Sequence, residues 1–266
     1  MLGKCAITAR VEPAVIIIFL ALPLLAYFVK GIVGAASAIV FNAILLFLIA
    51  FGANGSVTLV DGLLWVGLVD TVSSISMALM LRKQLRLEKP VMLLLAGMLP
   101  VIVAFSLLLK RLDLGVLTAV LAAAVVLAGL WLVLRPNPDP LSEKTANGVA
   151  FPLGVVSGVL SGLFAMAGPV VILYLAAGSN DPNVIRRRLV LISTCATITR
   201  TITLAADGEY NEQRMTWVLW SLPSVFAGLA AGIAVYRFVS PKVFRLALGL
   251  LVLLAGLAAA IKSIVA

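Results

Sequence analysis

VVSGVLSGLFAMAGPVVILYLAAG, residues 155–178, constrains the architecture of this chain more than any other segment. It is apolar throughout, but Gly168 and Pro169 interrupt it close to its middle. The interruption predicts two helical pieces, roughly 154–165 and 169–177, joined by a break of small residues. At about 1.5 Å per residue, neither piece comfortably spans a hydrocarbon layer of about 30 Å. The segment therefore predicts a broken helix pair inside a membrane.

Such a break has a functional and a structural interpretation. In a membrane, the freed backbone groups must face protein, ligand or water. In transporters, half-helix N-termini near the midplane bind anions, because their N–H groups and dipole point at the charge. Gly168-Pro169 fits such an N-terminus, with proline at the first helical position. The alternative is a tightly packed helix pair, since small residues also mediate close packing.

The composition is that of a membrane protein. Of 266 residues, 63% are hydrophobic and only 12% charged, whereas soluble domains have roughly 25% charged residues. The net charge of +9 lies mostly in short loops, where Lys and Arg set membrane orientation, so nucleic acid is not an expected partner. Histidine is absent, and two cysteines, Cys5 and Cys195, form no metal set or disulfide framework. No metal or other cofactor is expected.

Apolar runs recur on both sides of one polar segment. In the first half they are 14–29, 38–51, 57–81, 91–109 and 115–134, with KGIVGAAS (30–37) between the first two. In the second half they are the broken pair 149–177, then 186–206, 215–236 and 243–264. The polar segment 135–148, RPNPDPLSEKTANG, predicts a linker between a first repeat, 1–134, and a second, 149–266.

Short matches in the same order indicate that the two halves are copies. They are LPVI at 99–102 with LPSV at 222–225, LAGL at 127–130 with LAGL at 254–257, and Lys30-Gly31 to Ser37 with Ser161-Gly162 to Gly168. The series predicts an internal duplication.

Loop charge predicts that the copies are inverted. Loop 82–90 is strongly basic and should be cytoplasmic, whereas its counterpart 207–214 is mainly acidic. Residues 186–188 are three arginines, whereas their counterpart 52–56 is uncharged. Lys110-Arg111 does not fit this orientation, because it would lie on the outside. We therefore expect an all-α polytopic membrane protein of two inverted repeats. Each would hold a broken or re-entrant helix pair and three transmembrane helices, with both chain ends outside.

Arg200 is the most unusual charge in the apolar runs. It lies about 18 Å along a helix from Arg188, which places it near mid-membrane. An intramembrane arginine usually faces a cavity or a partner, and its planar guanidinium suits a sulfonate, phosphate or carboxylate. The alternative is a structural ion pair with Asp70, which could also carry protons or hold a coupling cation.

The other candidates lie at the two breaks. Lys30 could bind an anion or extend to the membrane interface, and Ser161 is as often a packing residue as a ligand. The candidate substrate-binding residues are Lys30, Gly34, Ser37, Ser161, Gly168, Pro169, Thr197 and Arg200.

SGVLSGLFAMAGPVVILYL (157–175) and its weaker first-half copy KGIVGAASAIV (30–40) resemble the sulfite exporter TauE/SafE family of membrane proteins. The resemblance implies a bacterial inner-membrane permease for small sulfur-containing anions, such as sulfite and organosulfonates. The family's second motif tends to read glycine, any residue, glycine, glycine, proline. This chain instead has Ala165-Met166-Ala167-Gly168-Pro169, and Ser37 stands where the first copy usually has glycine. The departure affects the exact substrate, not the fold.

We therefore predict a secondary transporter that works by alternating access around a midplane site formed by both breaks and Arg200. Its partners would be a small anionic substrate and the lipid bilayer, and homo-oligomerisation is left open. An anion channel, or a carrier of another carboxylate or oxyanion, remains the alternative. An intramembrane enzyme is not expected, because paired acids and histidines are missing from the apolar runs.

Overall fold

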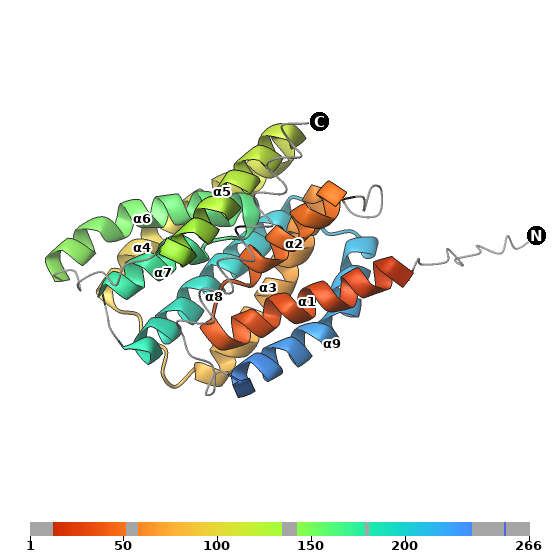
Figure 1. Ribbon diagram of the computed structural model, residues 1–266. Helices are drawn as coiled ribbons and strands as arrows, with labels where there is room; N and C mark the ends of the chain where they lie inside the picture. The colour runs from red at the N-terminus through yellow and green to blue at the C-terminus, as the bar shows by residue number, and fades with distance from the viewer. Residues whose placement is uncertain (1–12, 52–57, 135–142, 179–180, 236–252, 254–266) are drawn as a thin grey trace, which may run out of the picture.

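The computed structural model describes residues 13–51, 58–134, 143–178, 181–235 and 253. The described segments are helical throughout, without a strand among them (Figure 1). The first half contains α1 (Pro13–Val33), α2 (Ser37–Phe51), α3 (Leu59–Leu81), α4 (Lys89–Leu108), a 3-10 turn (Leu109–Arg111) and α5 (Leu114–Leu134). The second half contains α6 (Glu143–Phe164), α7 (Gly168–Gly178), α8 (Pro182–Ala206) and α9 (Glu212–Val235). Of the expected run 243–264, only residue 253 is among the described residues.

Five of these helices are long and apolar enough to cross a membrane: α3, α4, α6, α8 and α9. Large apolar side chains also point outward, among them Leu79, Leu219 and Trp220, which are 62–70% exposed. In water this surface would be costly, but against lipid tails it is the favoured one. The chain is therefore an all-α, multi-pass membrane protein, as its composition predicts.

Both helix breaks lie where the sequence predicts them. The first separates α1 from α2 at residues 34–36, and the second separates α6 from α7 at residues 165–167. The predicted length of the piece before the second break is wrong, because α6 begins at Glu143 and is itself long enough to span. Pro152 does not end α6, since packing along α4 outweighs the loss of one backbone hydrogen bond. Residues 143–148, which were predicted to be part of the linker, are the first turns of α6.

Two helix pairs form the flanks of the molecule, α1 with α9 and α6 with α4 (Figure 1). Glycines permit both contacts. A Cβ on Gly31 of α1 would lie 2.5 Å from the carbonyl oxygen of Leu229, and one on Gly158 of α6 would lie 2.7 Å from that of Met98. Such backbone approach is how small residues drive helix association in membranes. Each pair joins one helix from each half of the chain, so the halves are interlocked.

The two flanking pairs correspond to each other under the predicted duplication. Gly31 of α1 and Gly162 of α6 are matching residues of the predicted duplication. Gly31 closely approaches Leu229 in α9, and Gly162 closely approaches Ser106 in α4. Leu229 and Ser106 are matching residues too. Between the flanks, α3 packs against α8. The inverted orientation of the halves stays a prediction.

Candidate functional site

At each break, the residue that follows the first helix of the pair has a left-handed backbone conformation, and the first break has a second such residue, Ala36, with a φ of 78°. At the first, Gly34 has a φ of 88° and its N–H donates to the carbonyl of Lys30 at 2.7 Å. At the second, Ala165 has a φ of 56° and its N–H donates to the carbonyl of Ser161 at 2.9 Å. Gly34 and Ala165 are matching residues of the duplication. A left-handed φ ends a helix at little cost for glycine but strains alanine, so Ala165 has backbone strain that Gly34 avoids.

The breaks meet each other inside the molecule. The Asn42 side-chain nitrogen in α2 donates to the carbonyl of Phe164, the last residue of α6, at 2.8 Å. A Cβ on Gly168 would lie 3.7 Å from the backbone nitrogen of Ala36. The starts of α2 and α7 therefore face one another, and each brings backbone N–H groups that have no partner within their own helix.

A cavity of about 30 Å³ lies at this junction, which is space for roughly two water molecules. It is bordered by both breaks, by α3 and by α8. Six of the predicted site residues line it: Lys30, Ser37, Asp70, Ser161, Gly168 and Thr197. Gly34 shapes the turn beside it, and Pro169 follows in the first turn of α7. Arg200 does not line it.

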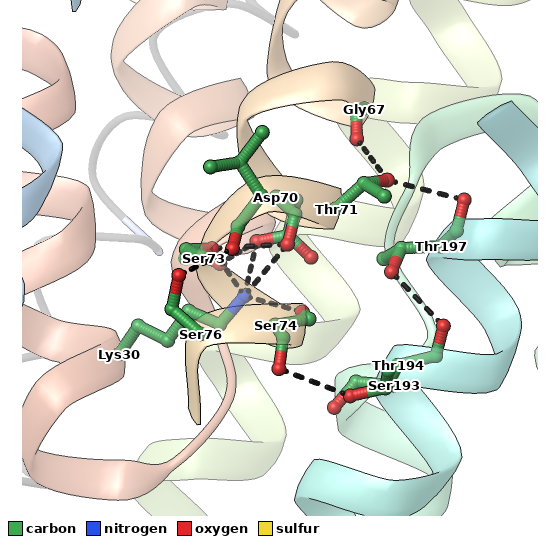
Figure 2. Close-up of polar contacts among 12 residues, drawn as sticks. Lys30, Gly67, Asp70, Thr71, Ser73, Ser74, Ser76, Ser193, Thr194 and Thr197 are labelled. Atoms are coloured by element: carbon green, nitrogen blue, oxygen red, sulfur yellow. Dashed lines mark hydrogen bonds and ion pairs between the residues drawn. The ribbon is translucent and has the colours of Figure 1, made fainter. Parts of the chain in front are cut away.

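The strongest polar cluster at the cavity surrounds the amine of Lys30, which is 1% exposed (Figure 2). Its Nζ lies 2.8 Å from Oδ1 of Asp70, 2.8 Å from the hydroxyl of Ser73 and 2.7 Å from that of Ser74. The hydroxyl of Ser37 donates to the same Asp70 oxygen at 2.5 Å. Lys30 therefore neither reaches a membrane interface nor stands alone in the cavity.

In the structure, Asp70 pairs with Lys30 and not with Arg200, so the alternative interpretation of Arg200 as the ion-pair partner of Asp70 is wrong. The sequence did hold the signal for the α3 side of the cluster. Asp70, Ser73 and Ser74 are spaced three and four apart, which places them on one helix face. It held no signal for the α1 side, since Lys30 is 40 residues away in the chain.

Arg200 is buried behind the second break, where it binds backbone. Its Nε donates to the carbonyl of Gly162 at 3.1 Å, and its Nη1 donates to the carbonyl of Leu63 at 3.2 Å. Gly67 leaves room for the guanidinium, because a Cβ there would overlap Nη1. Gly162 lies in the last turn of α6, where carbonyls lack helical partners and a cation is favoured by the helix dipole.

The charge of Arg200 has no acid within ion-pair distance among the described residues, and its Nη2 has no hydrogen-bond partner. Burial raises the pKa of the nearby Tyr210 hydroxyl, although Arg200 acts against the shift, so Tyr210 stays neutral. The first break has a similar arrangement, since Arg186 Nη2 donates to the carbonyl of Gly31 at 3.0 Å. Sequence reasoning missed this carbonyl-binding role of the two α8 arginines.

The other hydroxyls of α8 mostly bind their own helix or α3. Thr199 donates to the carbonyl of Cys195, and Thr203 to that of Thr199. The Thr71 hydroxyl of α3 lies 2.8 Å from the Thr201 hydroxyl. It also donates to the carbonyl of Thr197 at 3.2 Å (Figure 2). Some of these bonds join α3 to α8. The polar side chains that line the cavity are one cation, one carboxylate and a few hydroxyls, and its other lining residues are mostly apolar. Within the described part of the chain, no group of three or more acids, cysteines or histidines could hold a metal ion.

Comparison with known proteins identifies relatives of this chain. The family described as "Sulfite exporter TauE/SafE" matches residues 19–259. A protein of Cupriavidus necator, described as "Probable sulfite/organosulfonate exporter TauE", is 32% identical over 118 residues, which are 43% of this chain and 45% of that protein. The similarity thus spans less than half of the relative's length. No solved structure matches the chain.

Proposed function

Because the chain belongs to the sulfite exporter TauE/SafE family, we propose that it is a secondary transporter of small sulfur-containing anions, such as sulfite or organosulfonates, across the bacterial inner membrane. The observation that carries the proposal is the meeting of two matching helix breaks at a buried cavity that contains Lys30. The helices α2 and α7 start there, so their positive N-terminal ends face the same space as the lysine amine. That combination favours an anion.

Lys30 is the substrate-facing cation in this proposal, and Arg200 supports the second break. The anion would contact Lys30, the hydroxyls of Ser37, Ser161 and Thr197, and the backbone at Gly168. Arg200 keeps its role as a ligand of backbone carbonyls, because its guanidinium lies outside the cavity lining. Its charge still adds to the positive potential near the site.

The size of the cavity and the predicted duplication support alternating access. An oxyanion of sulfur needs more space than two water molecules, so the junction must widen to admit it. Two interlocked, matching halves offer a way to widen it on one side at a time, if the halves have opposite orientations in the membrane. The opposite charges of matching loops support that orientation.

A thermal-shift screen of the purified protein tests the substrate class. Sulfite, thiosulfate, sulfoacetate, taurine and sulfate are compared with a dicarboxylate of similar size. We expect a sulfur oxyanion to raise the melting temperature of the wild type but not of Gly168→Leu, whose side chain would fill the space beside Ala36. Gly178→Leu is the matched control on the same helix, because a Cβ there has no neighbour within 4 Å. Stabilisation of Gly168→Leu equal to that of the wild type would refute the site.

Transport by a carrier is tested by counterflow in proteoliposomes. Only a carrier exchanges labelled for unlabelled substrate across the membrane, so exchange supports alternating access and its absence supports a channel. Stabilisation by the dicarboxylate alone would assign the chain to another class of anion.

A further inference from the structure

Asp70 occupies the space in which the proposed function places an anion. Asp70 lines the cavity beside Lys30, and its side chain is only 7% exposed. Its Oδ1 already accepts hydrogen bonds from the Lys30 amine and the Ser37 hydroxyl. When the site is empty, the Asp70 carboxylate therefore binds the Lys30 amine and the Ser37 hydroxyl, which are two of the groups proposed to bind the substrate.

An anion cannot join this arrangement without a further change. The empty pair of Lys30 and Asp70 has no net charge, and adding a monovalent anion would leave one uncompensated negative charge in a buried site. Burying an unpaired charge is costly, and two anions in one site disfavour each other's charged form. Uptake of a proton by one of them removes both penalties. A sulfonate is too weak a base to take that proton, which leaves the carboxylate.

We propose that Asp70 binds the coupling proton, so that one proton enters the site with each anion. The inference rests on the proposed function. The Lys30 amine exchanges its hydrogen bond to Asp70 Oδ1 for one to the anion, and an O–H bond forms on the Asp70 carboxyl group. The loaded site then holds the Lys30 cation, the anion and a neutral acid, and has the same net charge as the empty site.

The surroundings of Lys30 suit this exchange. Ser73 and Ser74 hold its amine independently of the carboxylate, so neutralising Asp70 does not release the amine from the cavity wall (Figure 2). The titratable groups that face Asp70 are Lys30 and Tyr27 from α1 and, farther away, Arg200 from α8. The helix α2 has no ionisable side chain, and those of α9 lie at its start, where Arg214 binds Asp61. Asp70 is thus the one carboxylate that faces Lys30 among the described residues.

The consequence is a fixed relation between pH and affinity. When binding takes up one proton, the dissociation constant of the anion rises about tenfold for each unit of pH. This relation holds at pH values at which the empty site is not already protonated. A monovalent anion would also cross the membrane without net charge, so its transport rate would not follow the membrane potential.

The test uses methanesulfonate, which stays a monovalent anion between about pH 5 and about pH 8, unlike sulfite. Its dissociation constant is measured across this range for the wild type, Asp70→Asn and Asp61→Asn. We expect weaker binding at higher pH for the wild type and for Asp61→Asn, the control acid on the same helix. Asp70→Asn should bind with an affinity that does not change with pH, because its amide is always neutral.

Equal affinity of the wild type at all pH values would overturn the inference, as would a pH dependence retained by Asp70→Asn. If Asp70→Asn does not fold, titration calorimetry of the wild type in two buffers with different heats of ionisation decides the question. Uptake of about one proton per anion is expected, and no uptake would overturn the inference. Failure of every sulfur oxyanion to bind at any pH would instead refute the proposed function.

Discussion

The pair formed by Lys30 and Asp70 should make a large contribution to the stability of the native state, which single substitutions reveal. Lys30→Met removes a cation whose Nζ lies within 2.8 Å of three side-chain oxygens, and it leaves the Asp70 carboxylate buried. Asp70→Ala leaves the amine buried with only hydroxyls and a carbonyl as partners. Since the two side chains are 1% and 7% exposed, solvent cannot compensate. Stranding one member of a buried pair costs about 3–5 kcal/mol.

Removing both charges should cost much less than the sum of the two single changes. We expect the double variant to lose no more stability than either single variant, because it strands no charge, which corresponds to a coupling energy of at least about 3 kcal/mol between Lys30→Met and Asp70→Ala. In a chain of this size, about 1 kcal/mol corresponds to about 2 °C in melting temperature. Each single variant should therefore melt about 6–10 °C below the wild type, and the double variant should recover several degrees relative to additivity.

The assay is a melting curve of the four proteins in detergent, followed by tryptophan fluorescence at a pH near neutrality. The cycle of Arg200→Ala with Asp70→Ala is the control, because Arg200 binds carbonyls and shares no hydrogen bond with Asp70. Its two effects should be nearly additive. Additive losses for Lys30 and Asp70, together with strong coupling between Arg200 and Asp70, would refute the pairing described here.

Three further outcomes follow from the backbone and the packing. Ala165→Gly should stabilise the protein by about 1 kcal/mol, because its φ of 56° strains alanine but not glycine, and the melting temperature should rise by about 2 °C. Gly67→Ala should destabilise it by about 1–3 kcal/mol, since the added methyl group would overlap the Arg200 guanidinium, and the loss is read from the same melting curves. In a background without native cysteines, single cysteines at Gln84 and Asn211 should react with an impermeant reagent from opposite sides of the membrane.

Each outcome has a control or a refuting result. Gly148→Ala should not destabilise the protein, since it is also a helical glycine but a Cβ there has no neighbour within 4 Å. A loss of stability in Ala165→Gly would mean that the second break does not need a left-handed residue. Labelling of both cysteines from the same side would refute the inverted repeats.

The helices and both breaks were predictable because local chemistry dictates them. A membrane admits only helices that satisfy their own backbone, so runs of about 20 apolar residues show where they lie. Clusters of small residues show where helices stop, and glycine, as at Gly34, accepts without strain the left-handed turn that Ala165 adopts with strain. The same local signals failed at the start of α6, where Asn147, Gly148 and Pro152 are typical of a loop. Packing of that segment along α4 outweighed them, and no local pattern contains that contact.

The candidate site, too, was predictable from the sequence only in part. The sequence alone determined which residues are polar or charged within apolar helices, and five of these, together with Gly168, line one cavity. It also determined that Asp70, Ser73 and Ser74 share a helix face, because helical periodicity is local. Only the tertiary structure decided which cation the carboxylate meets. The hydropathy pattern does not say whether Lys30 or Arg200 pairs with Asp70. The pairing depends on how the end of α1 and the middle of α8 approach α3. Those approaches are set by side-chain packing between segments far apart in the chain, such as the close contact that Gly67 permits with Arg200.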